Sequence, residues 1–105
     1  MPLTIKLEKP IKRGDSEIAE IELRDVETND YIRLGAVGTL LVNKKGEQVY
    51  ADRPEIVQKY LTRLSGLSEK EIGQMELKDF FKAKEFISNQ LAFAYGSEVT
   101  GTSQG

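Results

Sequence analysis

The chain has 105 residues, a formal charge of −2 and a hydrophobic fraction of 39%, a balance that indicates one small folded domain rather than a disordered chain. With neither cysteine nor histidine, it has no means of forming disulfides, cysteine-ligated metal sites or histidine-based catalytic triads. The slightly acidic balance argues against nucleic acid as a partner, and no apolar run approaches the roughly 20 residues of a membrane span.

The first third of the chain is predicted to form a β-hairpin. Apolar and polar residues alternate over residues 3–7 and again over 18–24, with a Pro-, Gly- and Asp-containing cluster between the two runs, as expected for two antiparallel strands joined by a turn. That cluster contains Arg13-Gly14-Asp15, the tripeptide that adhesion proteins present to integrins. Because Gly14 permits a positive φ and Asp15 favours turns, we interpret the tripeptide as turn chemistry.

Residues 25–52 have a less regular pattern. Asn29 or Asp30 is placed to cap a short helix, and the same segment is compatible with a loop. Further on, residues 39–42 and 47–50 are predicted to form a second small hairpin with Gly46 in the left-handed region. A short helix over residues 35–42 competes with this interpretation, although its two glycines weaken it.

The last third is predicted to be helical. Asp52 is expected to cap a helix that has Pro54 in its first turn and ends at Gly66. Ser68 and Glu71 have the spacing of a capping box that opens a short second helix.

A longer third helix is expected from about Leu77 to about Ala94. The expected fold class is therefore α+β, with an N-terminal β-hairpin, a second small hairpin in the interpretation we favour, and about three α-helices. We expect a single domain over residues 1–95, followed by a small polar tail, residues 96–105, that is disordered.

No group of residues forms a convincing catalytic or metal-binding motif. Asp25, Glu27 and Asn29 match the first ligands of a calcium loop, but Asp30 and Ala36 stand where that loop needs Gly and a bidentate Glu. Other acidic residues lie near expected helix starts, where carboxylates favour the helix macrodipole. The sequence therefore predicts no catalytic residue, no metal and no cofactor.

The terminal helix has a wider apolar surface than one-sided packing needs. At about 100° per residue, one stripe is the expected core face, and further aromatic residues lie to either side of it. Two interpretations have similar weight: the other helices enclose this helix, or part of its surface binds a partner or another copy of the chain. The proposed partner-binding residues are Phe81, Phe86, Leu91 and Phe93.

Two segments carry an ordered set of short motifs. "LEKPIKRG" precedes the alternating "IAEIELR", and "RLSGLSEKEIGQMELKDF" follows downstream. They resemble the small tail assembly chaperones of contractile-tailed phages, the protein E-like family of Mu-like phages and their relatives. The similarity spans about residues 4–91, while the middle of the chain is longer than in the shortest relatives. The family-signature positions are Leu7, Pro10, Ile11, Arg13, Gly14, Leu23, Arg24, Arg63, Ser68 and Asp79.

The resemblance implies a non-catalytic protein. Such chaperones are thought to coat the long helical tape measure protein in the cytoplasm of the infected bacterium until tail tube subunits polymerise around it, and they are absent from the mature virion. The tape measure protein is therefore the expected partner. In many relatives a programmed frameshift adds an extension that recruits the tail tube protein, which would be a second partner. A wide apolar helical face on an acidic domain agrees with this role.

Other classes of protein stay open at this point. The main alternative is a structural tail component, or a small protein–protein adaptor, that stays in the particle. A small regulatory or nucleic-acid-binding protein is disfavoured because the sequence has no basic face. An enzyme has the least support.

Overall fold

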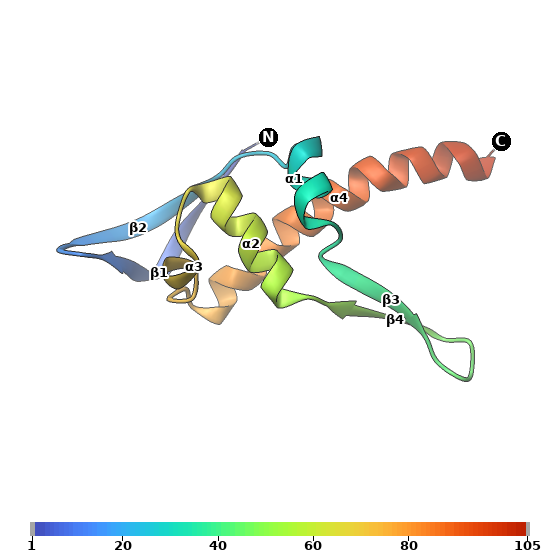
Figure 1. The fold of residues 1–105 in the computed structure, drawn as a ribbon, viewed down its shortest axis with the longest axis horizontal. Coiled ribbons are helices and arrows are strands. Elements are labelled where there is room, and N and C mark those ends of the chain that lie inside the picture. Colours follow the sequence, from blue (N-terminus) through green and yellow to red (C-terminus); the bar gives the residue numbers. More distant parts are fainter. Residues whose placement is uncertain (1, 105) are drawn as a thin grey trace.

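The computed structural model describes residues 2–104, without the side chains of Leu40, Tyr50, Phe93 and residues 95–104. In chain order the elements are β1 (Leu3–Arg13), β2 (Ser16–Leu23), α1 (Thr28–Leu34), β3 (Gly38–Val42), β4 (Gln48–Asp52), α2 (Pro54–Ser65), α3 (Glu69–Ile72) and α4 (Leu77–Gln104). Figure 1 shows the β1–β2 hairpin at one end, α2 and α3 further in, and the β3–β4 hairpin and the end of α4 at the other end. The predicted α+β class with an N-terminal hairpin is confirmed, and the described residues contain one short helix, α1, beyond the three expected.

The turn of the first hairpin consists of Gly14 and Asp15. Arg13 pairs with Ser16 across it, and Gly14 has a φ of 58°. No non-glycine residue described has a positive φ, so glycine stands at the first central position of a two-residue loop, as in a type II′ turn. The interpretation of Arg-Gly-Asp as turn chemistry is therefore confirmed by its geometry.

β1 contains a bulge that bends it over the helices. Ile5 pairs with Ile21, whereas Ile11 pairs with Ile18, and the register shifts between Lys6 and Ile11. Extra residues on one strand increase its bend and twist. Both Ile5 and Ile11 are consequently buried although they lie on either side of the bulge.

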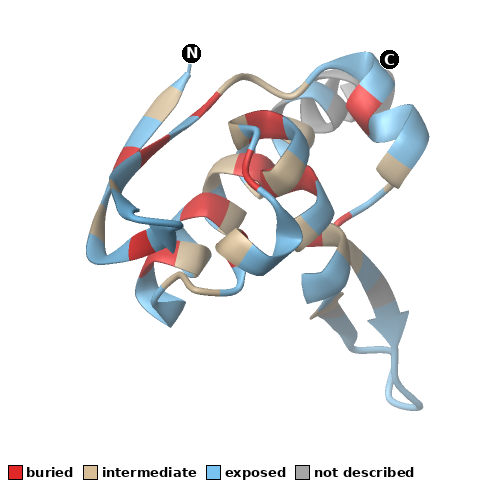
Figure 2. Cartoon of the chain, turned by 60° about the vertical axis from the view of Figure 1, so that its left-hand side comes forward, coloured by how far each residue is buried: buried red, intermediate tan, exposed pale blue. Residues whose placement is uncertain are grey.

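The second hairpin forms, as in the interpretation we favoured, and the competing helix over residues 35–42 does not. β3 pairs with β4 in register, with Leu41 opposite Val49, and Gly46 in the turn has a φ of 83°. Within the described chain, no other helix or strand packs along either strand. We call this hairpin, residues 38–52, the arm; Figures 1 and 2 show it projecting from the body with few buried positions.

Local capping signals place α2 and α3 as expected, with one correction. Pro54 begins α2, and Gly66 follows it in the left-handed conformation with a φ of 80°. The N-cap of α2 is Arg53 rather than Asp52. Asp52 instead ends β4, and its carboxylate accepts a hydrogen bond from Lys84 Nζ at 2.7 Å.

The remaining helices differ from the sequence expectations at their ends. α1 begins after Glu27, and Asp30 lies in its first turn rather than at its N-cap. α4 continues to Gln104 instead of ending near Ala94. The division into a domain over residues 1–95 and a disordered tail over residues 96–105 stays a prediction, since no side chain from residue 95 onward is described.

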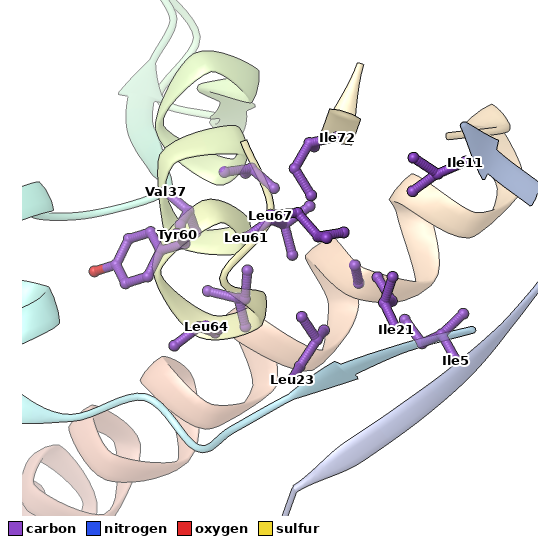
Figure 3. Close-up of a cluster of buried hydrophobic side chains, with 13 residues drawn as sticks. Ile5, Ile11, Ile21, Leu23, Val37, Tyr60, Leu61, Leu64, Leu67 and Ile72 are labelled. Carbon is purple, nitrogen blue, oxygen red and sulfur yellow. The ribbon is translucent and has the colours of Figure 1, made fainter. Parts of the chain in front are cut away.

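The core lies between the first hairpin and the helices. α2 packs against β2 and α4 against β1, and α3 contacts both α2 and β1. Burial of each large aliphatic side chain contributes about 1.5–3 kcal/mol, so this cluster is the main source of stability. Figure 3 shows the cluster, whose buried members include Ile5, Ile11, Ile21, Leu23, Tyr60, Leu61, Leu64, Leu67, Ile72, Ala83 and Ile87.

Tyr60 joins this core to the base of the arm. Its hydroxyl donates to the carbonyl of Gly35 at 2.6 Å, and burial raises the pKa of the phenol to about 12. Val37, the residue before β3, is buried, and its carbonyl accepts from Arg53 N–H at 2.8 Å. The arm therefore leaves the body from an anchored base.

Candidate partner-binding surface

The family-signature residues hold the first hairpin against the helices. Arg13 Nε and Nη2 donate to the two carboxylate oxygens of Glu71, in α3, at 2.6 and 2.8 Å. Glu71 also accepts from Ser68 N–H at 2.9 Å, while Ser68 Oγ accepts from Glu71 N–H. The predicted capping box is thus confirmed, and the Arg13 guanidinium is the main cause that lowers the pKa of Glu71 to about 2.

A second charged cluster joins β2, α1 and α2. Arg24 donates through both terminal nitrogens to the carboxylate of Asp30, at 2.8 and 3.0 Å, and Arg63 Nε donates to the same carboxylate at 2.8 Å. The Asp30 side chain is 1% exposed, and its hydrogen bonds, those of Arg24 first, hold its pKa well below the ordinary range for aspartate.

Sequence reasoning missed this role of Asp30. It named Asp30 only as a candidate cap, and as the residue at which the calcium-loop pattern fails. The available signal was that two of the signature positions, Arg24 and Arg63, are arginines, which bind buried carboxylates through a planar fork.

Asp79 fastens the bulge of β1 to the first turn of α4. Its side chain is fully buried, and Oδ2 accepts a hydrogen bond from Glu8 N–H at 2.9 Å. Lys82 Nζ lies 3.9 Å from the other oxygen. Of the remaining signature residues, Ile11 and Leu23 are buried, Leu7 packs partly against the core, and Pro10 and Gly14 are exposed.

The four residues proposed for partner binding occupy different environments. Phe81 is 49% exposed, with Lys84 Nζ 5.1 Å from the centre of its ring. Phe86 and Leu91 are partly buried and pack against the core. The Phe93 side chain lies outside the described part of the structure. Among these four residues, Phe81 is therefore the one whose side chain is described as exposed.

Further exposed apolar side chains were not singled out from the sequence. Leu77, one helical turn before Phe81, is 64% exposed, and with Phe81 it defines what we call the α4 patch. The arm exposes Leu41, Val42 and Val49, and α1 exposes Tyr31 and Ile32. The available signal for the arm was the run of consecutive apolar residues, Leu40, Leu41 and Val42, in the predicted second hairpin.

Clusters of acidic side chains that suit a metal ion are absent from the described residues. Nor does this part of the chain contain a helix long and apolar enough to cross a bilayer.

Taken together, fold and surface define a small α+β protein that exposes neighbouring apolar side chains on α1, on the arm and on α4. Residues 4–91 match the family described as phage tail assembly chaperone proteins, E, or 41 or 14. The chain belongs to this family, which confirms the resemblance in its motifs. Searches of curated proteins and of solved structures found no match. As a tail assembly chaperone it has protein partners in tail assembly.

Proposed function

We propose that this protein binds the tape measure protein in the host cytoplasm and keeps it soluble until tail tube subunits polymerise around it. It acts by binding, without catalysis, and is left out of the mature virion. Its family membership supports the general role, and the observation that favours a helical partner is the α4 patch.

Leu77 and Phe81 lie four positions apart in α4, so their side chains are on the same face of the helix. Two apolar side chains with this spacing fit the groove of another amphipathic helix. Lys84 lies beside Phe81 and is held there by its hydrogen bond to Asp52. A long helical protein with repeated apolar stripes would offer this patch many equivalent sites.

Many copies along one rod need only modest affinity each. Each bound copy covers part of an apolar stripe, and the chain's net charge of −2 adds repulsion between coated rods. Release to the tail tube is easier from weak individual sites than from a few tight ones.

The test is co-expression of this chain with the tape measure protein, with the soluble fraction of the latter as the measurement. We expect the wild-type chain to keep the tape measure protein soluble and Leu77→Ser with Phe81→Ser to lose most of that effect. Ile32→Ser is the matched control, because Ile32 is exposed but lies on α1. A tape measure protein that is equally soluble with no chaperone, or with the double variant, would contradict the proposal.

The composition of purified tails distinguishes the chaperone role from the alternative role, a structural tail component or adaptor. The chaperone role requires that the chain be absent from them. A second partner, the tail tube protein, requires a longer form made by frameshifting. Sequencing the 3′ end of the gene for a slippery heptamer and an overlapping frame tests for that form.

A further inference from the structure

The arm has two free edges and no covering element. In the described chain its sheet consists of β3 and β4 alone, and Leu41, Val42 and Val49 are each at least half exposed. A two-stranded hairpin by itself is marginally stable in water, and natural proteins usually protect free edges with Lys or Pro within the strand. Neither residue occurs between Gln48 and Asp52.

The hydrogen bonds at the two ends of the arm determine which backbone groups face the free edge of β4. Asn43 N–H donates to the Glu47 carbonyl, and Arg53 N–H donates to the Val37 carbonyl. Because the direction of the backbone groups alternates along a strand, the odd-numbered residues of β4 face β3. Gln48, Tyr50 and Asp52 therefore direct their N–H and C=O groups outward.

We propose that two copies of this chain associate by antiparallel pairing of their β4 edges, on a two-fold axis through Tyr50. In this register Gln48 of one copy lies opposite Asp52 of the other, and Tyr50 lies opposite Tyr50, so all three outward-facing residues exchange backbone hydrogen bonds. The product is a four-stranded sheet in the order β3-β4-β4-β3. Tape measure binding through the α4 patch does not depend on this contact.

Charge complementarity selects both the partner and the register. Centred on Tyr50, the pairing places Glu47 directly opposite Arg53 of the second copy, once on each side of the axis. These are non-hydrogen-bonded positions, where facing side chains lie closest. Both side chains are exposed, and their present partners are local: Asn43 for Glu47, and Glu55 for Arg53 at a loose 3.7 Å.

The neighbouring registers that keep even-numbered residues opposite each other are disfavoured. Centred on residue 49, the pairing brings Asp52 opposite Gly46, which lies in the turn of the arm; centred on residue 51, it brings Gln48 opposite Pro54, which begins α2 and has no N–H. Each shift therefore leaves one outward-facing residue of each copy without a strand partner. The edge of β3 offers no comparable charge pairing, because charged residues, Lys44 and Lys45, flank it closely at its turn end alone.

The Tyr50-centred register also joins apolar side chains across the axis. Val49 of one copy lies opposite Ala51 of the other, and Leu41, the neighbour of Val49 in β3, extends the stripe on both sides. In Figure 1 β4 is on the side of the arm that faces away from α1. The edge is therefore open to a second arm.

The test is the mass of the purified chain alone in sedimentation equilibrium over a concentration series, with no tape measure protein present. We expect a monomer–dimer equilibrium. Glu47→Arg alone and Arg53→Glu alone should each weaken it about tenfold or more, because each creates two like-charge contacts per dimer. The double exchange, Glu47→Arg with Arg53→Glu, should restore it. Circular dichroism of each variant verifies the fold.

A chain that stays monomeric at every soluble concentration would overturn the proposal. So would a dimer that both single variants leave unchanged, or that the double exchange fails to restore. The proposed function has a separate readout, since the tape measure assay uses Leu77 and Phe81.

Crosslinking supplies a second measurement, since the chain contains no cysteine. Facing residues of a hydrogen-bonded antiparallel pair have Cα atoms about 5.5 Å apart, within the range of a disulfide. Tyr50→Cys should therefore form a covalent dimer on mild oxidation. Leu40→Cys, opposite Tyr50 in the same arm, is the matched control and should not. Crosslinking through position 40 and not 50 would place the contact on β3 and overturn the proposal.

Discussion

Arg13, at the end of β1, holds both carboxylate oxygens of Glu71, at 2.6 and 2.8 Å, and so joins the turn of the first hairpin to the start of α3. The arginine of the Arg-Gly-Asp tripeptide is thus bound to another element of the same chain. Glu71 at the same time completes the capping box with Ser68. One glutamate therefore both starts α3 and positions the hairpin.

The Arg13–Glu71 pair should make the stability of the fold fall as the pH is lowered into the acidic range. The pKa of Glu71 is lowered from 4.5 to about 2 in the folded chain. A lowered folded-state pKa contributes stability that is present above the unfolded value, near 4.5, and is lost as pH falls towards 2. We expect Arg13→Gln to reduce the loss of stability over this interval, measured as the urea midpoint at a series of pH values.

Lys12→Gln, a neighbouring exposed cation, is the control for a general charge effect. Because Arg13 is half exposed, added salt should shrink the difference between Arg13→Gln and wild type. If the urea midpoints of Arg13→Gln and wild type fell in parallel with pH at low salt, the Arg13–Glu71 pair would make no contribution to the acid dependence of stability.

Removal of the Asp30 charge should destabilise the fold. Asp30→Asn keeps the shape but leaves Arg24 and Arg63 without their shared carboxylate. Since both arginines retain contact with solvent, we expect a loss of about 2 kcal/mol rather than the larger value for a fully buried pair. Urea denaturation measures it. Glu55→Gln, which removes an exposed acid 3.7 Å from Arg53, should stay within about 0.5 kcal/mol.

Asp79 should stabilise the fold through its hydrogen bond to the backbone of β1 rather than through its contact with Lys82. Asp79→Ala leaves the N–H of Glu8 without its acceptor, and we expect a loss of about 1–3 kcal/mol. Lys82→Met removes the 3.9 Å contact and should be close to neutral. Thermal unfolding of both variants, with hydrogen exchange at the bulge, compares the two. Equal destabilisation by both changes would mean that the ion pair is the main contact.

Substitution of Phe81 should affect stability little, whereas substitution of Phe86 should lower it. Phe86 packs against the core, whereas Phe81 is about half exposed. Phe86→Ser is therefore expected to lower the free energy of unfolding by about 2–3 kcal/mol, and Phe81→Ser by less than about 1 kcal/mol. Chemical denaturation gives both values. A larger loss for Phe81→Ser would place Phe81 in the core and remove it from the proposed surface.

Signals that act over a few residues were predictable from the sequence. The turn at Gly14, the helix start at Pro54, the helix end at Gly66 and the capping box of Ser68 are local because each depends on backbone preferences or on bonds within one turn. Their geometry was therefore expected correctly.

Signals that depend on distant parts of the chain were not predictable in this way. Asp52 has a good capping side chain, yet it pairs with Lys84 of α4 and leaves the cap position to Arg53. Asp30 was seen as a cap candidate because its partners Arg24 and Arg63 come from two other elements. The exposure of Phe81 and the burial of Phe86 likewise depend on which faces of α4 the hairpin and α2 cover.

By itself, the sequence determined the α+β class, the two turns, the start and end of α2, the capping box of α3, and the family. These follow from alternation, helical period and turn residues, and from short motifs in a fixed order. Only the tertiary structure decided that the signature residues fasten the hairpin to the helices and that the arm stands free. The reason is physical: burial and charge pairing depend on which surfaces meet, and residues separated by dozens of positions meet only in the folded chain.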